Sequence, residues 1–371
     1  MIEINDGRVQ KEFSKISFSN YKKSDVIKKM IEGVRFQKIE ESYYWCAELL
    51  CAGHYSDLWN TFFKIMSQYI HSGNPKLPIY LLMRYNNFCD IANSEKYTSI
   101  LDVRNNGEVR RLFVEIICVL CLSTKKHELT RFKIKNDNYN IVENAHNLNA
   151  PHVGFGKPFM KQYDPEELLI PINEFAYCLD STQKNTIKAC FWVEWILKFA
   201  NQKKKNKKIK QLQKERDEQQ KHLTNTNYDL MMGNFINIKN EKPLPKYEDI
   251  KITNRKMPVD DKFRNNIVWI IWEVILHYSN KSYNKMITEI INALFQLFCT
   301  RYTTSVNNKR ILIIYQAINI LTERADFDID VIQHAPLIEK MQKNTDAIFT
   351  QIKTSECEKP ISYLFTNIIK Q

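Results

Sequence analysis

Apolar residues recur at three- and four-residue spacing along most of the sequence, and this periodicity is the strongest constraint on the fold. Such spacing places side chains on one face of an α-helix, as it does for Leu58, Phe62 and Met66. Glycine and proline number only 8 and 11 among 371 residues, whereas turn-rich all-β folds need many more of both. The sequence therefore predicts an all-α protein made of multi-helix bundles.

Capping residues, glycines and prolines indicate where the predicted helices begin and end. We expect one helix after Ser24 that ends near Gly33, and another that starts at an N-cap on Ser56 with Asp57 in its first turn. Further helices are predicted at Glu40–Ala52 (before a stop at Gly53), Leu77–Phe88 (with Pro78 at its start), Val109–Leu122, Thr186–Ala200, Asn266–Tyr278, Met286–Phe298, Ile311–Leu321 and, as one or two helices, Ile338–Ile369.

The predicted helices fall into two groups, separated by a segment of weak periodicity that is rich in Asn, His and Pro. We therefore divide the chain into an N-terminal helical, collar-like bundle (1–124), an irregular connecting region (125–180) and a C-terminal helical domain (181–371). The C-terminal domain carries a basic insertion at about 201–260.

Positive charge is concentrated in one part of that insertion. The formal net charge is +12, and residues 203–221 hold nine Lys or Arg against three acids, which is half of the excess. A basic segment favours nucleic acid or an anionic surface as partner. Without interleaved aromatic residues it would contact phosphates non-specifically and be sensitive to salt. The alternative is a solvated helical extension or loop. The candidate contact residues are Lys203, Lys204, Lys205, Lys207, Lys208 and Lys210.

The start of the sequence and its cysteines bear on the compartment. Residues 1–6 have neither the basic start nor the apolar run of a secretory signal, and no run of eighteen apolar residues occurs. The nine cysteines, an odd number, are scattered through apolar helical patterns, as expected of buried thiols in a reducing compartment. We expect a soluble, intracellular protein with no transmembrane segment and no disulfide bonds.

Motifs for a nucleotide or for zinc are incomplete. Gly154-Phe-Gly-Lys157 is the nearest approach to a phosphate-binding loop, but Pro158 follows it and no strand is predicted before it. Cys118 and Cys121 have the spacing of half a zinc site, but they lie in an apolar helix and no second pair follows at a suitable distance. A buried structural pair of thiols is the simpler interpretation.

Two further groupings lack residues that their chemistry requires. Alternating aspartates at 326, 328 and 330 suggest a calcium loop, but Val331 stands where glycine is needed and Leu337 where the terminal glutamate is needed. Cys51, His54 and His71 could be imagined as a nucleophile with its bases, although histidines near loop ends are commonly surface or capping residues. We therefore expect no metal, no cofactor, no catalytic residue and no enzymatic activity.

A segment near the N-terminus resembles the C-terminal collar region of RarA-type (Werner-interacting) AAA+ ATPases. Residues 25–82 contain a Y-W-x-A-E-L-like helix, a glycine, a second amphipathic helix and a proline-containing turn, in the order found in that region. The ATPase module itself is missing here. The resemblance implies a collar-like bundle that oligomerises, related to the collars of clamp loaders. The residues with the implied collar-like packing are Tyr44, Trp45, Glu48, Leu49, Gly53, Trp59 and Pro75.

Most of the chain is also similar to a family of uncharacterised proteins from large nucleocytoplasmic DNA viruses of the mimivirus and algal-virus kind. Besides the Y-W-x-A-E-L block, the similarity is carried by Phe191–Leu197, Ile267–Glu273 and Ala317–Glu323. It implies a viral protein located in the host cytoplasm, in the viral factory or in the virion.

Together, the two resemblances and the incomplete motifs lead us to expect a non-enzymatic helical interaction or scaffold protein. Its partners would be proteins of DNA replication or repair, in an oligomer or a replication complex. One alternative is a minor structural virion protein that contacts the genome or a membrane through the basic segment. Another is a protein that binds DNA or RNA non-specifically.

Overall fold

The computed structural model describes residues 2–94, 97, 99–126, 130–134, 147–161, 164–180, 182–205, 267–300 and 304–354. Helices dominate these residues, and an isolated antiparallel β-bridge joins Ile16 to Lys22. The predicted all-α fold is confirmed. The chain divides into two compact units: unit 1 contains the described residues up to 126 and from 329 onward, and unit 2 contains those from 130 to 328.

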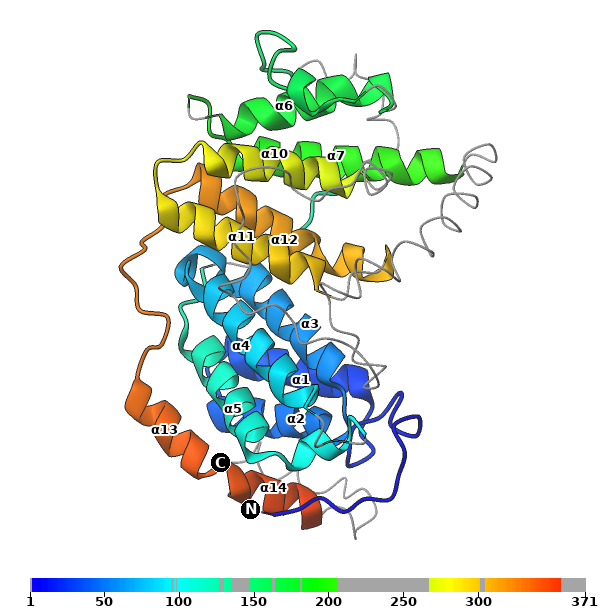
Figure 1. Ribbon diagram of the computed structural model, residues 1–371, viewed down its shortest axis with the longest axis vertical. Helices are drawn as coiled ribbons and strands as arrows, with labels where there is room; N and C mark the ends of the chain where they lie inside the picture. The colour runs from blue at the N-terminus through cyan, green and yellow to red at the C-terminus, as the bar shows by residue number, and fades with distance from the viewer. Residues whose placement is uncertain are drawn as a thin grey trace. The chain divides into compact units, whose positions relative to one another are not determined.

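Unit 1 is a helical bundle (Figure 1), and many of its buried side chains are aromatic. Its helices are α1 (Lys23–Arg35), α2 (Ile39–Cys51), α3 (Tyr55–Ile65), α4 (Leu77–Ala92), α5 (Gly107–Leu122), α13 (Ala335–Lys343) and α14 (Thr345–Thr354). α2 packs against α1 and α5, and α4 packs against α5. The ring of Trp59 on α3 has the rings of Tyr85, Phe88 and Phe113 within 6 Å, at 5.1, 5.9 and 5.7 Å between centroids. Such contacts join α3, α4 and α5 into one core.

Two glycines of unit 1 have different roles. The sequence predicts that the first helix ends near Gly33, but α1 runs on to Arg35. Gly33 is instead a point where α2 approaches α1, because a Cβ atom at this position would lie 2.4 Å from Ser42 Oγ. Gly53 has a φ of +73° just after α2. This left-handed conformation, which suits glycine, ends the helix as predicted.

α3 begins slightly earlier than predicted. Its first residue is Tyr55, so Ser56 lies inside the helix and is not its N-cap. The carbonyl of His54 already accepts an intrahelical hydrogen bond, which places the helix start before the serine. Asp57 does lie in the first turn, where its negative charge interacts favourably with the positive end of the helix dipole. Its carboxylate also pairs with Lys23 at 2.9 Å.

Unit 2 contains α6 (Leu169–Leu179), α7 (Thr186–Lys205), α10 (Val268–Asn280), α11 (Lys285–Cys299) and α12 (Thr304–Thr322). α6 packs against α7, α12 packs against α7 and α11, and α10 packs against α11. The guanidinium of Arg310 donates to the Phe298 carbonyl at 2.7 Å. A cation on α12 thus provides a hydrogen-bond donor for a backbone carbonyl in the last turn of α11. Among the described residues of both units, no helix is long and apolar enough to cross a membrane.

α6 lies inside the region that the sequence predicts to be irregular, residues 125–180. Its apolar side chains, such as Ile172 and Phe175, are buried as in any core helix. Asn173 and Glu174 are buried as well, because they bind the loop that precedes the helix. Polar residues on the buried face hide the helical period, so the apolar pattern alone does not predict this helix.

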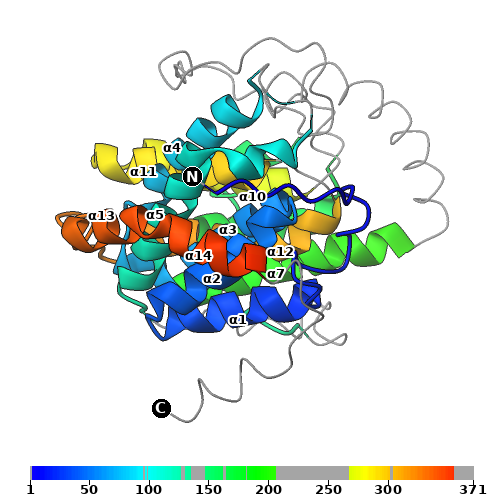
Figure 2. The same ribbon diagram turned by 90° about the horizontal axis from the view of Figure 1, so that it is seen from below.

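The C-terminal helices α13 and α14 belong to unit 1, whereas the sequence-based division groups them with the C-terminal domain. α13 lies alongside α5, and α14 packs against α2 and α5 (Figures 1 and 2). The buried residues Ile338 and Met341 of α13 and Phe349 and Ile352 of α14 form the inward faces. An amphipathic pattern predicts a buried face but does not say which bundle covers it.

Candidate functional site

The residues with predicted collar-like packing lie inside unit 1. Trp45, Glu48, Leu49, Gly53, Trp59 and Pro75 are buried, and Tyr44 is half-buried. Trp45 packs edge-to-face against Tyr21 and Tyr44, with ring centroids at 5.6 and 5.1 Å. These side chains hold the bundle together. A partner of unit 1 would therefore meet other residues.

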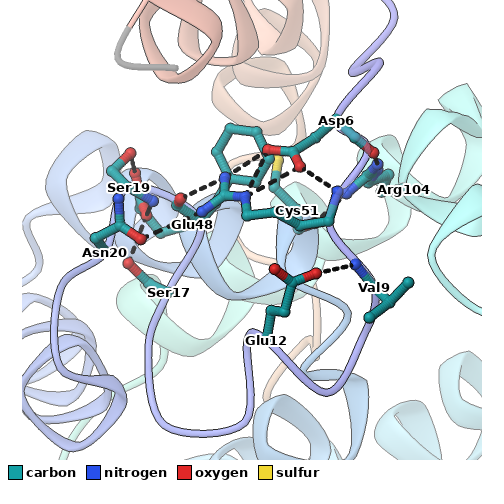
Figure 3. A network of polar contacts seen from close by, with 11 residues as sticks. Asp6, Val9, Glu12, Ser17, Ser19, Asn20, Glu48, Cys51 and Arg104 are labelled. Carbon is teal, nitrogen blue, oxygen red and sulfur yellow. Dashed lines mark hydrogen bonds and ion pairs between the residues drawn. The ribbon is translucent and has the colours of Figure 1, made fainter. Parts of the chain in front are cut away.

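Glu48 of α2 anchors a loop near the N-terminus. Its fully buried carboxylate accepts hydrogen bonds from Ser17 Oγ at 2.7 Å, from Ser19 N at 3.0 Å and from Ser19 Oγ at 2.6 Å (Figure 3). Burying a carboxylate is costly unless donors replace water, and these three donors do so. Burial, followed by the charge of Glu48, raises the pKa of Tyr44. The carboxylate is thus engaged in fixing the loop.

Arg8 closes the same loop on its other side. Its Nε and Nη2 atoms bind the carboxylate of Asp6 at 2.9 and 2.5 Å, and Nη2 also donates to the Phe18 carbonyl at 3.0 Å. The guanidinium lies over the rings of Phe13 and Phe18, 4.5 and 5.1 Å from their centroids. Burial raises the pKa of Asp6, but the hydrogen bonds from Arg8 outweigh this effect and hold the pKa below its ordinary value. The ion pair is therefore present at neutral pH.

Residues 2–8, called the N-terminal segment below, are bound to unit 1 through their main chain. The side-chain amide of Asn105 accepts from the Ile4 amide at 2.9 Å and donates to the Ile4 carbonyl at 3.1 Å. Arg110 donates to the Ile2 carbonyl at 2.8 Å, and Arg104 to the Asp6 carbonyl at 3.1 Å. Figure 3 shows Asp6 beside Arg104. The main chain is thus held at Ile2, Ile4 and Asp6 by side chains from the rest of unit 1.

The side chains of the N-terminal segment alternate accordingly. Ile4 is buried, whereas Glu3, Asn5 and Gly7 are exposed. This is the period of an extended chain with one face against its support. The segment is consequently held like a strand, although its hydrogen-bond partners are side chains and not another strand. Lys353 of α14 adds a bond to the Glu3 carbonyl at 2.7 Å.

The two arginines that hold the segment are buried and have further partners. Arg104 donates to the carbonyl of Cys51 at 3.1 Å, which fixes the end of α2. Arg110 donates to the Arg104 carbonyl at 2.8 Å and to Asn105 Oδ1 at 3.0 Å, and its guanidinium lies 3.8 Å from the centroid of the Phe349 ring. Burial lowers the pKa of Arg110. These contacts fix the directions of both guanidinium groups independently of their bonds to the segment.

A cavity of about 450 Å³ lies between α5, α13 and α14. Arg110, Arg111 and Lys343 line it together with Glu339 and Asp346. Arg110 thus connects this cavity to the Ile2 end of the N-terminal segment. Charged side chains of both signs line the cavity, so it lacks the mostly apolar lining that is typical of small-molecule sites.

The histidine that could have served as a catalytic base has a structural role. His54 Nε2 donates to the Ile16 carbonyl at 2.7 Å, and its Nδ1 lies 3.8 Å from Asp57. Burial lowers the pKa of His54, so the neutral ring is the form that holds the loop. His71 is fully buried, with Nδ1 at 3.3 Å from Ser72 Oγ.

The structure also accounts for the cysteine pair with zinc-like spacing. Cys118 and Cys121 are buried in α5, with Cys121 Sγ 3.7 Å from Ser42 Oγ. Burial raises the pKa of Cys118 to about 12 and that of Cys121 to about 11, and a metal binds the thiolate and not the thiol. In the described parts of the chain, no group of three or more His, Cys, Asp or Glu residues could hold a metal ion.

The glycine-containing loop of unit 2 is shaped by α6. The Gly156 amide donates to Asn173 Oδ1 at 2.8 Å, and the amides of Asn149 and Ala150 donate to the carboxylate of Glu174 at 2.8 and 3.0 Å. A Cβ atom on Gly156 would lie 2.8 Å from the Asn173 backbone. Close packing therefore explains the glycine at 156, and the amides of Asn149, Ala150 and Gly156 are engaged with side chains of α6.

Several residues of these networks were missed by sequence reasoning. Asn105 and Arg110 lie next to or at the start of a predicted helix and form no motif. In unit 2, Arg131 binds the buried carboxylate of Glu194 at 2.6 and 2.7 Å, and Tyr315 donates to it at 3.0 Å. The sequence offers no signal for such pairs, because their members are 63 and 121 residues apart.

The predicted basic contact residues are placed only in part. Lys203, Lys204 and Lys205 form the end of α7, while Lys207, Lys208 and Lys210 lie outside the described residues. The prediction that they contact nucleic acid or an anionic surface stays a prediction.

Comparison with known proteins gives no assignment. No protein-family model, no curated protein and no solved structure matches this chain. The resemblances to collar regions and to viral proteins therefore stay predictions.

Proposed function

We propose that this chain is a non-enzymatic helical interaction protein that binds protein partners and assembles with DNA replication or repair proteins of a large DNA virus. The observation that carries the proposal is the binding of the N-terminal segment to unit 1. Asn105, Arg104 and Arg110 hold a peptide main chain at Ile4, Asp6 and Ile2, respectively. Hydrogen bonds to the main chain give affinity when an extended peptide adds to a sheet edge, and here side chains of the bundle make such bonds instead.

The roles of the candidate reactive groups support the proposal. His54, one of the groups that could be imagined as a catalytic base, binds Ile16, and the buried carboxylate of Glu48 binds Ser17 and Ser19 of the same loop. Each of these bonds stabilises the fold of unit 1. The viral and replication setting rests on the resemblances of the sequence alone.

Affinity purification from cells that contain the natural partners tests the proposal. The tagged natural chain is purified with and without nuclease treatment, and the recovered proteins are quantified by mass spectrometry. We expect replication or repair proteins to remain bound after nuclease treatment. A matched variant, with Lys203, Lys204 and Lys205 replaced by glutamine, should recover the same proteins. Recovery of capsid proteins alone, or of the chain by itself, would contradict the proposal.

Non-specific nucleic-acid binding is the second candidate. The observation in its favour is that α7 continues as a helix through Lys205, so the first lysines of the basic segment follow directly from a core helix. The log of the affinity for duplex DNA should then fall linearly with the log of salt concentration, with a slope near −0.9 for each phosphate contacted. Replacing the six candidate lysines, Lys203 to Lys210, by glutamine should reduce the slope and the affinity. Unchanged affinity in this variant would rule out the segment as the binding site.

A further inference from the structure

The N-terminal segment behaves in the structure as a ligand that is tethered to its own binding site. Its main chain is held by Asn105, Arg104 and Arg110, and none of these side chains lies in the segment itself. The segment offers one buried side chain, Ile4, and an Asp6–Arg8 ion pair. We infer that this surface of unit 1 is a docking site for an extended peptide, and that its partner is the N-terminal segment of a second copy of this chain.

Main-chain contacts alone would accept many peptides, but the other contacts are selective. The position of Ile4 needs an apolar side chain, because the residue is 1% exposed. Arg8 must reach the Phe18 carbonyl and the rings of Phe13 and Phe18. The N-terminal segment of a second copy meets these requirements because it has the same Ile4 and Arg8.

The connection after the segment is suited to exchange. Val9, Gln10, Lys11 and Glu12 are exposed, and a turn closed by the Glu12 amide and the Val9 carbonyl at 3.0 Å follows the segment. If this turn opens, residues 2–8 can bind a neighbouring copy through the same contacts that they make in their own. Exchange of an identical element costs little beyond the change in the turn and the entropy of association. It is therefore governed by protein concentration.

Occupation by the chain's own segment competes with binding in trans. A short tether gives the segment an effective concentration in the millimolar range. A natural chain should thus bind a second segment weakly, and a chain whose own segment cannot dock should bind it more tightly. This inference deepens the proposed interaction function and rests on it, since it names one partner of the same protein.

A peptide-binding measurement on full-length chains tests the inference. The probe is a fluorescent synthetic peptide with the sequence of residues 2–9, and binding is followed by anisotropy. The Ile4→Asp chain, whose own segment carries a charge at the buried position, should bind the peptide about tenfold or more tightly than the natural chain. The matched control Asn5→Asp changes the charge at a neighbouring exposed position and should bind like the natural chain. A peptide with aspartate at position 4 should bind none of them.

A second measurement detects the exchange directly between full-length chains. Natural-isotope and ¹⁵N-labelled full-length chains, each with a photo-crosslinking residue in place of the exposed Glu3, are mixed and irradiated. We expect crosslinks between the isotopes, from position 3 to the α14 region around Lys353, that increase with protein concentration and disappear when the donor chain also carries Ile4→Asp. If all crosslinks stay within one isotope at every concentration, and the peptide fails to bind a folded Ile4→Asp chain, the inference is wrong. Recovery of replication proteins in the affinity purification would be unaffected by that result, so the proposed function can stand without it.

Discussion

Ser19 binds Glu48 twice, through its amide at 3.0 Å and through its hydroxyl at 2.6 Å. The two residues lie 29 positions apart, and their bonds join the loop before α1 to the buried side of α2. Because the carboxylate is inside the bundle, this contact is a structural requirement of unit 1. It leads to the first prediction.

Replacing Glu48 by glutamine should destabilise unit 1 by about 1.5–3 kcal/mol, because a neutral amide with one acceptor oxygen replaces a charged carboxylate with two. Urea denaturation followed by circular dichroism measures the change. Glu41→Gln is the matched control, since Glu41 lies on the same helix and forms an exposed pair with Lys38 at 3.2 Å. That change should cost no more than about 1 kcal/mol. Equal effects of the two substitutions would argue against the buried anchor.

The stability of unit 1 should depend on pH through His54. Burial lowers the pKa of this histidine from its usual value of 6.5. As the pH falls, the histidine is therefore protonated in the unfolded chain before it is protonated in the folded protein. The contribution of the neutral ring is therefore complete above pH 6.5 and is lost as the pH falls towards the pKa of the folded state. Denaturation midpoints between pH 7.5 and pH 5 measure this loss. It should be smaller in His54→Gln and unchanged in His334→Asn, a substitution at an exposed position.

Two glycines in the loop before α6 should respond differently to the same substitution. Gly156→Ala places a methyl group 2.8 Å from the Asn173 backbone, and the resulting shift should cost unit 2 about 1–3 kcal/mol. At Gly154 the nearest atoms belong to the side chain of His152, which is exposed and can turn away. Gly154→Ala should cost less. Thermal or urea unfolding distinguishes the two variants, and a larger loss for Gly154→Ala would contradict the packing described for this loop.

Much of the fold was predictable because apolar spacing determines which faces are buried. α2, α4, α5, α10 and α11 correspond closely to predicted helices, since each has an apolar face interrupted by few buried polar residues. α6 was not predicted, because Asn173 and Glu174 lie on its buried face. The grouping of α13 and α14 with unit 1 was also not predictable. It depends on contacts with α2 and α5 that are more than 200 residues away in sequence, as the 231-residue separation of Gln342 and Arg111 illustrates.

The docking of the N-terminal segment was least accessible to sequence reasoning. The segment bonds through its backbone carbonyls and the Ile4 amide, which are groups that nearly every residue possesses, and its partners are single side chains in and before α5 and on α14. The alternation of Ile2 and Ile4 with polar residues is typical of a short strand, but it does not indicate that side chains of a helical bundle would hold the main chain. Only the folded arrangement brings Asn105 within hydrogen-bond distance of Ile4, 101 residues away.

Amide hydrogen exchange at Ile4 is the measurement that tests the central claim most directly. If Asn105 holds the main chain of the N-terminal segment, the Ile4 amide of the natural chain should exchange far more slowly than that of an unstructured peptide. Asn105→Leu should remove this protection, while Asn5→Ala, at an exposed position in the same segment, should keep it. An Ile4 amide that exchanges in the natural chain at the rate of an unstructured peptide would show that unit 1 does not hold the segment.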